Sequence, residues 1–441
     1  MNTSHVDEPL FDGHLETWRL ALTSALCFLI TSFSAAAGIG GGGLLVPTYA
    51  VVLGLGAKLA VPVSKATIFG VAVGNGMVIV RRKHPTATCR PLVDYNIAVL
   101  MQAGVLLGVA AGVLLNTILP EIVLVVTLAI VLGFNAYKTL SKARRMWLQE
   151  SRAKIESGGG GDGPKAAGAK AADVNAADAR AVAVSEELVT AQLLQLARED
   201  QTQYPLWAWG SLLQMLAFLI LHSLLMSGHI DPSVTPCSDM FWLLYALPLP
   251  VYVSLLAFFS SRNHRGYKLR AQAGHDFEGE LQWTQRASVL LPLAAVCSGA
   301  MSGMLGIGGG MMLGPLLLSL SLDPQVSAAT TGLMLIFTGA AGASEYLAVG
   351  LLPWRYALWF GGLGFAGGQT GQRVVRRMVE RSGRPSLVVC LLGAVIAAAV
   401  ICMTAIGVVN IAARASHHEP IGAFHVDRLR CHGEGGETRR S

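Results

Sequence analysis

A succession of long apolar runs is the feature of this sequence that most constrains its fold. Several runs approach the roughly 20 residues that an α-helix needs to cross a bilayer. Hydrophobic residues make up 53% of the 441 residues and charged residues 14%, whereas soluble domains usually carry about 25% charged residues. Because backbone polar groups must be paired inside lipid, the runs predict helices. We therefore expect an all-α, polytopic integral membrane protein.

About twelve apolar runs follow one another along the chain. They lie near 19–37, 43–56, 60–80, 97–117, 121–140, 206–226, 240–260, 287–305, 311–322, 326–348, 356–372 and 386–410. They divide the chain into an N-terminal tail (1–18), a first transmembrane repeat (19–140), a linker (141–205), two additional spans (206–260), a loop (261–286), a second transmembrane repeat (287–410) and a C-terminal tail (411–441). The N-terminal tail is acidic and has no Lys or Arg, so we expect a retained first span rather than a signal peptide.

Basic residues gather in four loops between the runs, at 81–90, 142–145, 262–270 and 373–384. With twelve crossings all four loops lie on one side, which is then cytoplasmic, and the N-terminal tail lies on the other side. Two runs are short, with about 14 and 12 residues (43–56 and 311–322). If both were re-entrant, the loop 373–384 would lie opposite the other three, so the charge distribution favours twelve crossings over ten.

The linker is a cytoplasmic segment of low complexity. Four consecutive glycines at 158–161 are followed by sequence rich in Ala, Lys and Asp. A segment of this composition buries too little apolar surface to fold alone. We therefore predict no independently folded domain between the two halves.

An internal repeat relates the two halves. The pattern GIGGG, four residues, then Pro occurs at 38–47 and again at 306–315. Downstream, VSKAT at 63–67 is echoed by VSAAT at 326–330. Each copy then has five spans, and the first spans of the two copies are seven segments apart. Since seven is odd, the repeats are predicted to be inverted in the membrane, as in many secondary transporters.

The glycine-rich turns interrupt apolar runs at matching places in both halves, which in transporters points to the binding site. Glycine lets the backbone turn sharply and approach a ligand, and a helix that starts after such a turn presents N–H groups that suit an anion. Nearby hydroxyls add hydrogen-bonding groups, and Lys65 would attract a negative solute. The predicted substrate-binding residues are Gly38, Gly40, Gly41, Ser64, Thr67, Gly306, Gly308, Gly309, Ser327, Thr330 and Thr331.

Simpler explanations compete at these positions. Glycines also pack membrane helices together, which better explains the glycine series at 104–112 and 364–368 and explains the two turns equally well. Ser and Thr hydroxyls usually bond to their own helix backbone, and the simpler explanation of Lys65 is that it extends to the membrane interface. Three polar residues remain within apolar runs, Asn75, Glu345 and Gln369, and the last two are candidates for coupling or for attracting the anion. Glu345 either carries a coupling proton or lies near the outer surface in contact with water.

Several other classes of function are disfavoured. Residues 38–43 match the spacing G-x-G-x-x-G, but the dinucleotide-binding motif needs a preceding strand in a soluble βαβ unit. The sequence shows no CxxC pair and no His/Cys cluster with metal-ligand spacing, so we expect neither a metal nor another cofactor. No nucleophile–base pair is placed within the runs, so we do not expect an enzyme. Nucleic-acid binding would need a basic face on a soluble domain.

The paired GIGGG-x4-P motifs, one in the opening part of each half, resemble the sulfite exporter TauE/SafE family. The resemblance covers roughly 19–140 and 287–410, and the long linker and additional spans resemble the larger eukaryotic members. It implies a secondary transporter that exports or exchanges a small anion, such as sulfite, a sulfonate or a related organic acid, in the plasma membrane or an endomembrane. The alternatives are a membrane scaffold or receptor-like protein that reuses the fold, and a channel or intramembrane enzyme.

Overall fold

A computed structural model describes residues 17–84, 90–157, 202–226, 243–272, 281–382 and part of 386–405, with single gaps at 37, 39, 245 and 321. The described residues form α-helices joined by turns, and an isolated bridge between Lys83 and Pro91 is the one pairing of extended backbone among them. The all-α prediction is therefore confirmed for this part of the chain. Nearly all of the two predicted tails and most of the predicted linker lie outside it.

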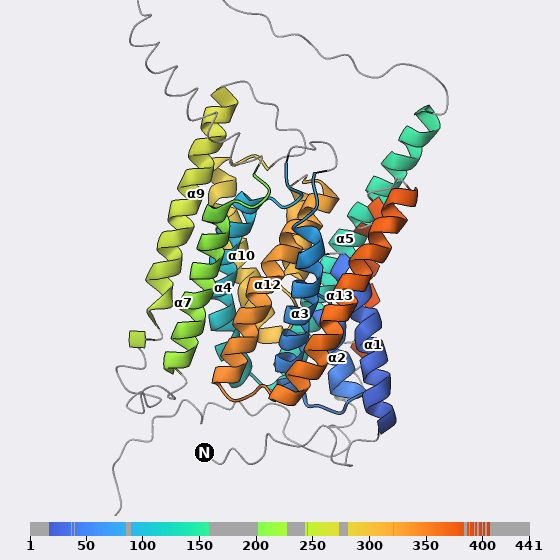
Figure 1. The fold of residues 1–441 in the computed structure, drawn as a ribbon, viewed down its shortest axis with the longest axis vertical. Coiled ribbons are helices and arrows are strands. Elements are labelled where there is room, and N and C mark those ends of the chain that lie inside the picture. Colours follow the sequence, from blue (N-terminus) through green and yellow to red (C-terminus); the bar gives the residue numbers. More distant parts are fainter. Residues whose placement is uncertain are drawn as a thin grey trace, which may run out of the picture.

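The helices follow the predicted apolar runs in order (Figure 1). They are α1 (Thr17–Ala36), α2 (Gly42–Val51), α3 (Ala57–Ile79), α4 (Tyr95–Ile118), α5 (Glu121–Ser157), α7 (Leu206–Met226), α9 (Pro248–Gln272), α10 (Gln285–Leu305), α11 (Gly310–Ser319), α12 (Pro324–Ala348) and α13 (Trp354–Ser382). The described residues between 386 and 405 are also helical.

Polar side chains begin three of these helices where the sequence enters an apolar run. Asp94 precedes α4, Thr284 precedes α10 and Asp323 precedes α12, and each side-chain oxygen accepts a backbone N–H from the first turn of its helix. Such caps satisfy N–H groups that have no partner within the helix and stabilise it by about 1 kcal/mol each. Local sequence therefore fixes where α4, α10 and α12 start.

Six helices among the described residues are long and apolar enough to cross a membrane: α1, α3, α4, α7, α10 and α12. The helices α2 and α11 have 10 residues each, which gives about 15 Å of helix. That length is half of the roughly 30 Å hydrocarbon core of a bilayer. The prediction of about twelve crossings is thus met in part, by six helices of sufficient length and composition.

Each short helix folds back along the helix before it. The Cys27 thiol in the middle of α1 lies 3.3 Å from the Tyr49 hydroxyl near the end of α2. A Cβ added at Gly41, just before α2, would meet Ser34 near the end of α1. The two helices therefore run in opposite directions. In the second half, the hydroxyls of α10 donate to carbonyls of the turn that leads to α11. The pairs α1–α2 and α10–α11 are therefore helical hairpins in which a half-length helix returns toward the end where its partner began.

This return explains why the four basic segments still share one end of the bundle. Figure 1 shows the segments 81–84, 141–157, 262–272 and 373–382 at the end drawn at the top. The start of α1 and the end of α2 lie together at the opposite end. A helical hairpin ends on the side of the membrane where it began, as two full crossings also do. Two hairpins and twelve full crossings therefore place the basic segments on the same side, so the charge distribution does not distinguish a short returning helix from a full crossing.

The centre of the bundle is the contact between α3 and α12, which run in opposite directions. Lys65, near the start of α3, lies against Gly342, near the end of α12, and Asn75 lies against Gly332 nearer the start of α12. Four other large contacts join helices that run in the same direction: α13 on α3, α4 on α10, α13 on α1, and α12 on α4. The residues that meet in them are, in that order, Gly364 with Thr67 and Gly368 with Val71; Gly104 with Ala295 and Gly112 with Met304; Gly367 with Thr31 and Gly371 with Ser32; and Thr330 with Asp94 and Thr338 with Gln102.

The glycine series at 104–112 and 364–368 serve these contacts. A Cβ added at Gly108 or Gly112 would overlap the backbone of α10, and one added at Gly364 or Gly368 would overlap the backbone of α3. Helices approach this closely only where a side chain is missing. The packing interpretation of both series is confirmed.

Two boundaries differ from the predicted ones. The helix α5 continues to Ser157, 17 residues into the predicted linker, because the extension is rich in Lys, Arg, Glu, Ala and Leu, which favour helix independently of burial. The helix α9 begins at Pro248 rather than near 240 and continues through basic residues to Gln272. Apolar content located both segments but did not mark where the helices end.

Candidate functional site

The first glycine turn needs glycine for its backbone conformation. Gly38, Gly40 and Gly41 have φ angles of 71°, 74° and 81°, in the left-handed region that disfavours residues with a Cβ. In the second turn Gly306 has φ 69°, whereas Gly309 is right-handed and serves as the residue before α11. The two motifs share a sequence pattern but differ in backbone conformation.

The two turns touch each other inside the bundle. A Cβ added at Gly42 would lie 2.5 Å from the Gly306 carbonyl oxygen and 2.9 Å from the Gly308 nitrogen. Each turn also packs on a helix from the other half of the chain. Gly38 abuts Ala328 and Thr331 of α12, and Gly306 abuts α3. The structure therefore brings both predicted turns into one place, at the contact between the two halves.

Both short helices point their N-terminal ends at this place. Neither Gly41 before α2 nor Gly309 before α11 provides a side-chain cap. The residues that precede α2 and α11 thus offer no side-chain acceptor to the first backbone N–H groups, and the partial positive charge of each helix end is directed to the interior. This arrangement favours a negative group near the turns.

The side chain of Lys65 brings its amino group beside the second turn. Its side chain is 1% exposed, and its Nζ donates to the Ser302 hydroxyl at 2.7 Å, with the Ile307 carbonyl oxygen at 3.5 Å. Ser302 in turn donates to the same Ile307 oxygen at 2.7 Å. The interpretation that Lys65 extends to the membrane interface is wrong, because its ammonium group lies inside the protein at the end of α10.

The predicted hydroxyls divide between the turns and other partners. Ser64 donates to the Gly306 carbonyl at 3.0 Å, and Thr331 faces Gly38 while donating to its own helix at Ser327. The remaining three are bonded elsewhere: Thr67 pairs with Tyr49, Ser327 donates to Gly314 at 3.4 Å, and Thr330 accepts the Asp94 N–H. Ser64 and Thr331 are therefore the hydroxyls that the structure brings to the turns.

Glu345 is buried although it lies one turn from the end of α12. Its side chain is 7% exposed, which decides against the interpretation that it sits in water at the outer surface. Its Oε2 has no hydrogen-bond partner among the described residues, and Glu345 interacts electrostatically with Lys65. Gln369, in contrast, is half-buried on α13, contacts Met77 and Arg373, and is not part of this cluster.

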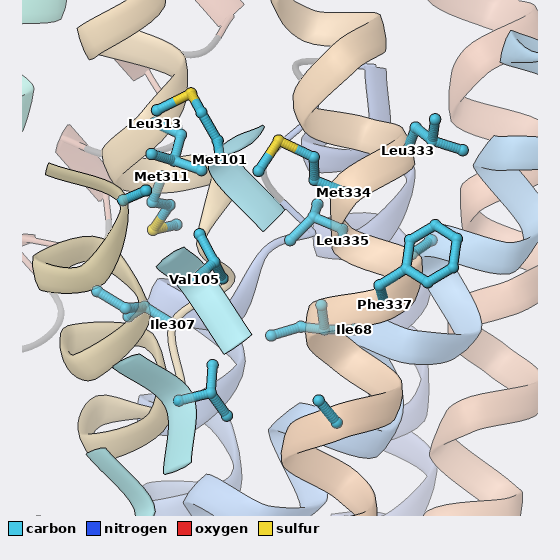
Figure 2. Close-up of a cluster of buried hydrophobic side chains, with 14 of the residues drawn as sticks. Ile68, Met101, Val105, Ile307, Met311, Leu313, Leu333, Met334, Leu335 and Phe337 are labelled. Carbon is cyan, nitrogen blue, oxygen red and sulfur yellow. The ribbon is translucent and has the colours of Figure 1, made fainter. Parts of the chain in front are cut away.

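Apolar side chains surround the turns. A Cβ on Gly40 would meet Ile68 and Leu335, and Figure 2 shows these two residues beside each other on α3 and α12. A Cβ on Gly309 would lie 3.8 Å from Val105 Cγ1 of α4, and Figure 2 shows Ile307 of the same turn near Val105. A mostly apolar surrounding with a few convergent polar groups is typical of small-molecule sites.

Sequence reasoning missed the serines that precede the second turn. Ser302 holds Lys65, and Ser298 donates to the Gly309 carbonyl at 3.2 Å. These residues are four apart, so they share one face of α10 and both reach the turn that follows. Their spacing directly before the GIGGG motif was the available indication.

Comparisons with known proteins agree with this picture. Residues 181–400 match the family model described as sulfite exporter TauE/SafE. Two similar curated proteins, both from Arabidopsis thaliana, are sulfite exporter TauE/SafE family protein 3, 27% identical over 92% of this chain and 82% of that protein, and family protein 1, 29% identical over 92% of this chain and 88% of that protein. No solved structure matches the chain. The matched range includes 206–260, so the resemblance extends to the two additional spans.

Proposed function

We propose that this chain, which belongs to the sulfite exporter TauE/SafE family, is a secondary transporter that exports or exchanges a small anion such as sulfite, a sulfonate or a related organic acid. It is an integral membrane protein of a transporter family. The observation that carries the proposal is Lys65, an ammonium group buried beside two uncapped helix N-termini. Three sources of positive potential at one buried place favour an anion.

The two halves form inverted five-helix repeats in this proposal. The motif order, the opposite directions of α3 and α12, and the matching pairs α13 on α1 and α10 on α4 all support this arrangement. Transporters built in this way alternate access by moving one repeat against the other around a central site. The contact between the turns is where such a movement would separate the halves.

Flux measurements in liposomes test the proposal. The purified protein is reconstituted, and the uptake of sulfite, sulfate, thiosulfate, methanesulfonate and a small carboxylate is measured against empty liposomes. We expect flux of sulfite or a sulfonate in the wild type and at least a tenfold loss with Lys65→Gln, which removes the buried charge. Lys58→Gln is the matched control, because Lys58 lies on the same helix and is only half-buried.

The wild-type panel decides the proposal. Absence of flux for every anion, with protein that is folded by size-exclusion chromatography, would refute transport of these anions. Full flux in Lys65→Gln would leave a transporter but would remove the buried ammonium from its binding site.

A further inference from the structure

Two opposite charges, Lys65 of α3 and Glu345 of α12, are buried together where the two halves of the chain meet. We propose that Glu345 is a replaceable internal counter-ion of Lys65, so that an anion arriving at Lys65 takes over its role while Glu345 binds one proton. The anion and the proton would then cross the membrane together. This inference rests on the proposed anion transport and names its coupling ion.

The packing of α3 on α12 puts both charges at one place. The Lys65 side chain passes directly over Gly342, where an added Cβ would lie 3.0 Å from its Cδ and 3.3 Å from its Cε. Glu345 follows Gly342 by three residues and lies on the same face of α12. The absence of a side chain at Gly342 therefore lets the lysine reach the turn of α12 that carries the carboxylate.

The neighbours of Glu345 leave its carboxylate without a hydrogen-bond donor to Oε2. Two tyrosines lie close enough to interact with it electrostatically, Tyr252 of α9 and Tyr346 of α12. Both hydroxyls donate elsewhere, to the Met215 carbonyl and to the Gly303 carbonyl, each at 2.8 Å. Among the described residues, the cation that interacts electrostatically with Glu345 is Lys65. A buried carboxylate that interacts electrostatically with one cation and lacks a donor to Oε2 among the described residues can accept a proton when an anion occupies that cation.

The first copy of the repeat carries the lysine, and the second copy lacks it at the corresponding position. In the repeated pattern, VSKAT of the first copy corresponds to VSAAT of the second, so Ala328 stands where Lys65 stands. The ammonium contacts the end of α10 and the second turn through Ser302. Within the described part of the chain, Lys65 is thus the cation bonded at the turns, and one negative charge neutralises it.

Charge balance then sets the stoichiometry. With Glu345 ionised, the pair is neutral; a monovalent anion at Lys65 adds one negative charge to a site where net charge is costly. One proton from the aqueous side that the site faces, bound to a Glu345 carboxylate oxygen, restores neutrality. Release reverses both steps: the anion leaves Lys65, the proton leaves Glu345, and the pair re-forms. One proton accompanies each monovalent anion.

Methanesulfonate is the probe, because it is the anion of a strong acid and carries no proton of its own near neutral pH. Reconstituted vesicles contain a fluorescent pH indicator, and the membrane potential is clamped with valinomycin and equal potassium on both sides. We expect an inward methanesulfonate gradient to acidify the lumen in the wild type. Glu345→Gln, which imitates the protonated carboxyl, should exchange labelled methanesulfonate without moving protons. Glu380→Gln, at an exposed position on α13, should behave as the wild type.

A binding measurement on the wild type alone covers the case in which Glu345→Gln fails to fold. Because binding takes up a proton, methanesulfonate affinity should rise as pH falls, by up to about tenfold per pH unit for one proton. Thermal-shift titrations at pH 6 and pH 8 measure this change, which should vanish in a folded Glu345→Gln protein. Methanesulfonate flux without acidification, or affinity independent of pH, would overturn the counter-ion inference and leave anion transport standing. If the wild type carries sulfite but no methanesulfonate, the inference is also overturned; if it carries no anion, the proposed function fails as well.

Discussion

The substitution Gly38→Ala tests whether the contact between the first turn and α12 is as close as the structure shows. Gly38 combines two features that an alanine disturbs, a φ angle of 71° and an approach to the backbone of Ala328 and the hydroxyl of Thr331. Gly350 provides a matched control, since it has φ 75° but no atom within 4 Å of its Cβ position. The pair separates backbone conformation from close packing.

The expected costs follow from these two features. A residue with a Cβ in the left-handed region loses about 1–2 kcal/mol, and this loss applies to both positions. At Gly38 the methyl group would lie 2.6 Å from Thr331 Oγ1 and closer still to the Ala328 carbonyl oxygen, and overpacking of this kind costs about 1–3 kcal/mol more. The stabilising effect of Gly→Ala on the unfolded chain is the same at both sites and cancels in the difference. We therefore expect Gly38→Ala to be less stable than Gly350→Ala by about 1–3 kcal/mol.

Equilibrium unfolding in mixed detergent micelles measures the free energy of unfolding of both variants, and sulfite uptake in liposomes measures their activity. Gly38→Ala should also lose flux, because its methyl group wedges apart the two halves where they meet. Equal stability of the two variants would show that the first turn does not pack closely on α12. The contact between the two halves at Gly38 would then be refuted.

Three further substitutions address the helix contacts, a buried hydroxyl pair and the linker. Gly108→Leu should prevent the close approach of α4 to α10 and greatly reduce the yield of folded protein, whereas Gly133→Leu, with nothing near its Cβ position, should fold normally by size-exclusion chromatography. Tyr49→Phe removes the 2.8 Å bond to Thr67 and should lower the free energy of unfolding by about 0.5–1.5 kcal/mol, while Tyr137→Phe, 74% exposed, should have no effect. Residues 158–201 can be replaced with a Gly/Ser linker of equal length, which leaves Gln203 in place to accept the hydrogen bond from Tyr95 at the start of α4. Sulfite flux should be preserved. Loss of binding to a partner protein with flux intact would instead favour the scaffold alternative.

Sequence periodicity and length were enough to predict where most helices lie, because a lipid-exposed span must be continuous and apolar. The segment 206–226 coincides with α7, and the glycine motifs mark both turns. What composition alone could not reveal is direction within a hairpin. A run such as 311–322 has the same apolar character whether it continues across the membrane or folds back, and the choice depends on contacts made by Ser298 and Ser302 with the turn.

The candidate site was predictable in its backbone but not in its charges. Repeated glycines identify places where chain must approach chain, so both turns were found. The partnership of Lys65 with Glu345 depends on the opposite directions of α3 and α12, which bring residues 280 positions apart in sequence to one place. The sequence alone does not show which residue lies beside a buried charged side chain. Without a known partner, the simplest explanation of such a residue is that it lies at the surface.

The difference between Lys65 in the first copy and Ala328 in the second bears on how the two repeats could move during transport. If the repeats exchange conformations during transport, each must be able to adopt the packing of the other, yet Lys65 contacts the end of α10 and the second turn. In such an exchange the anion would stay with α3 and the second turn while the first turn moves relative to them. Gly38, packed on α12 at Ala328 and Thr331, lies on that moving boundary. Placing a lysine at Ala328 in a Lys65→Ala background would transfer the charge to the first turn. Restored sulfite binding there would indicate that the repeats are interchangeable, whereas its absence would tie the binding site to Ser302 and the second turn.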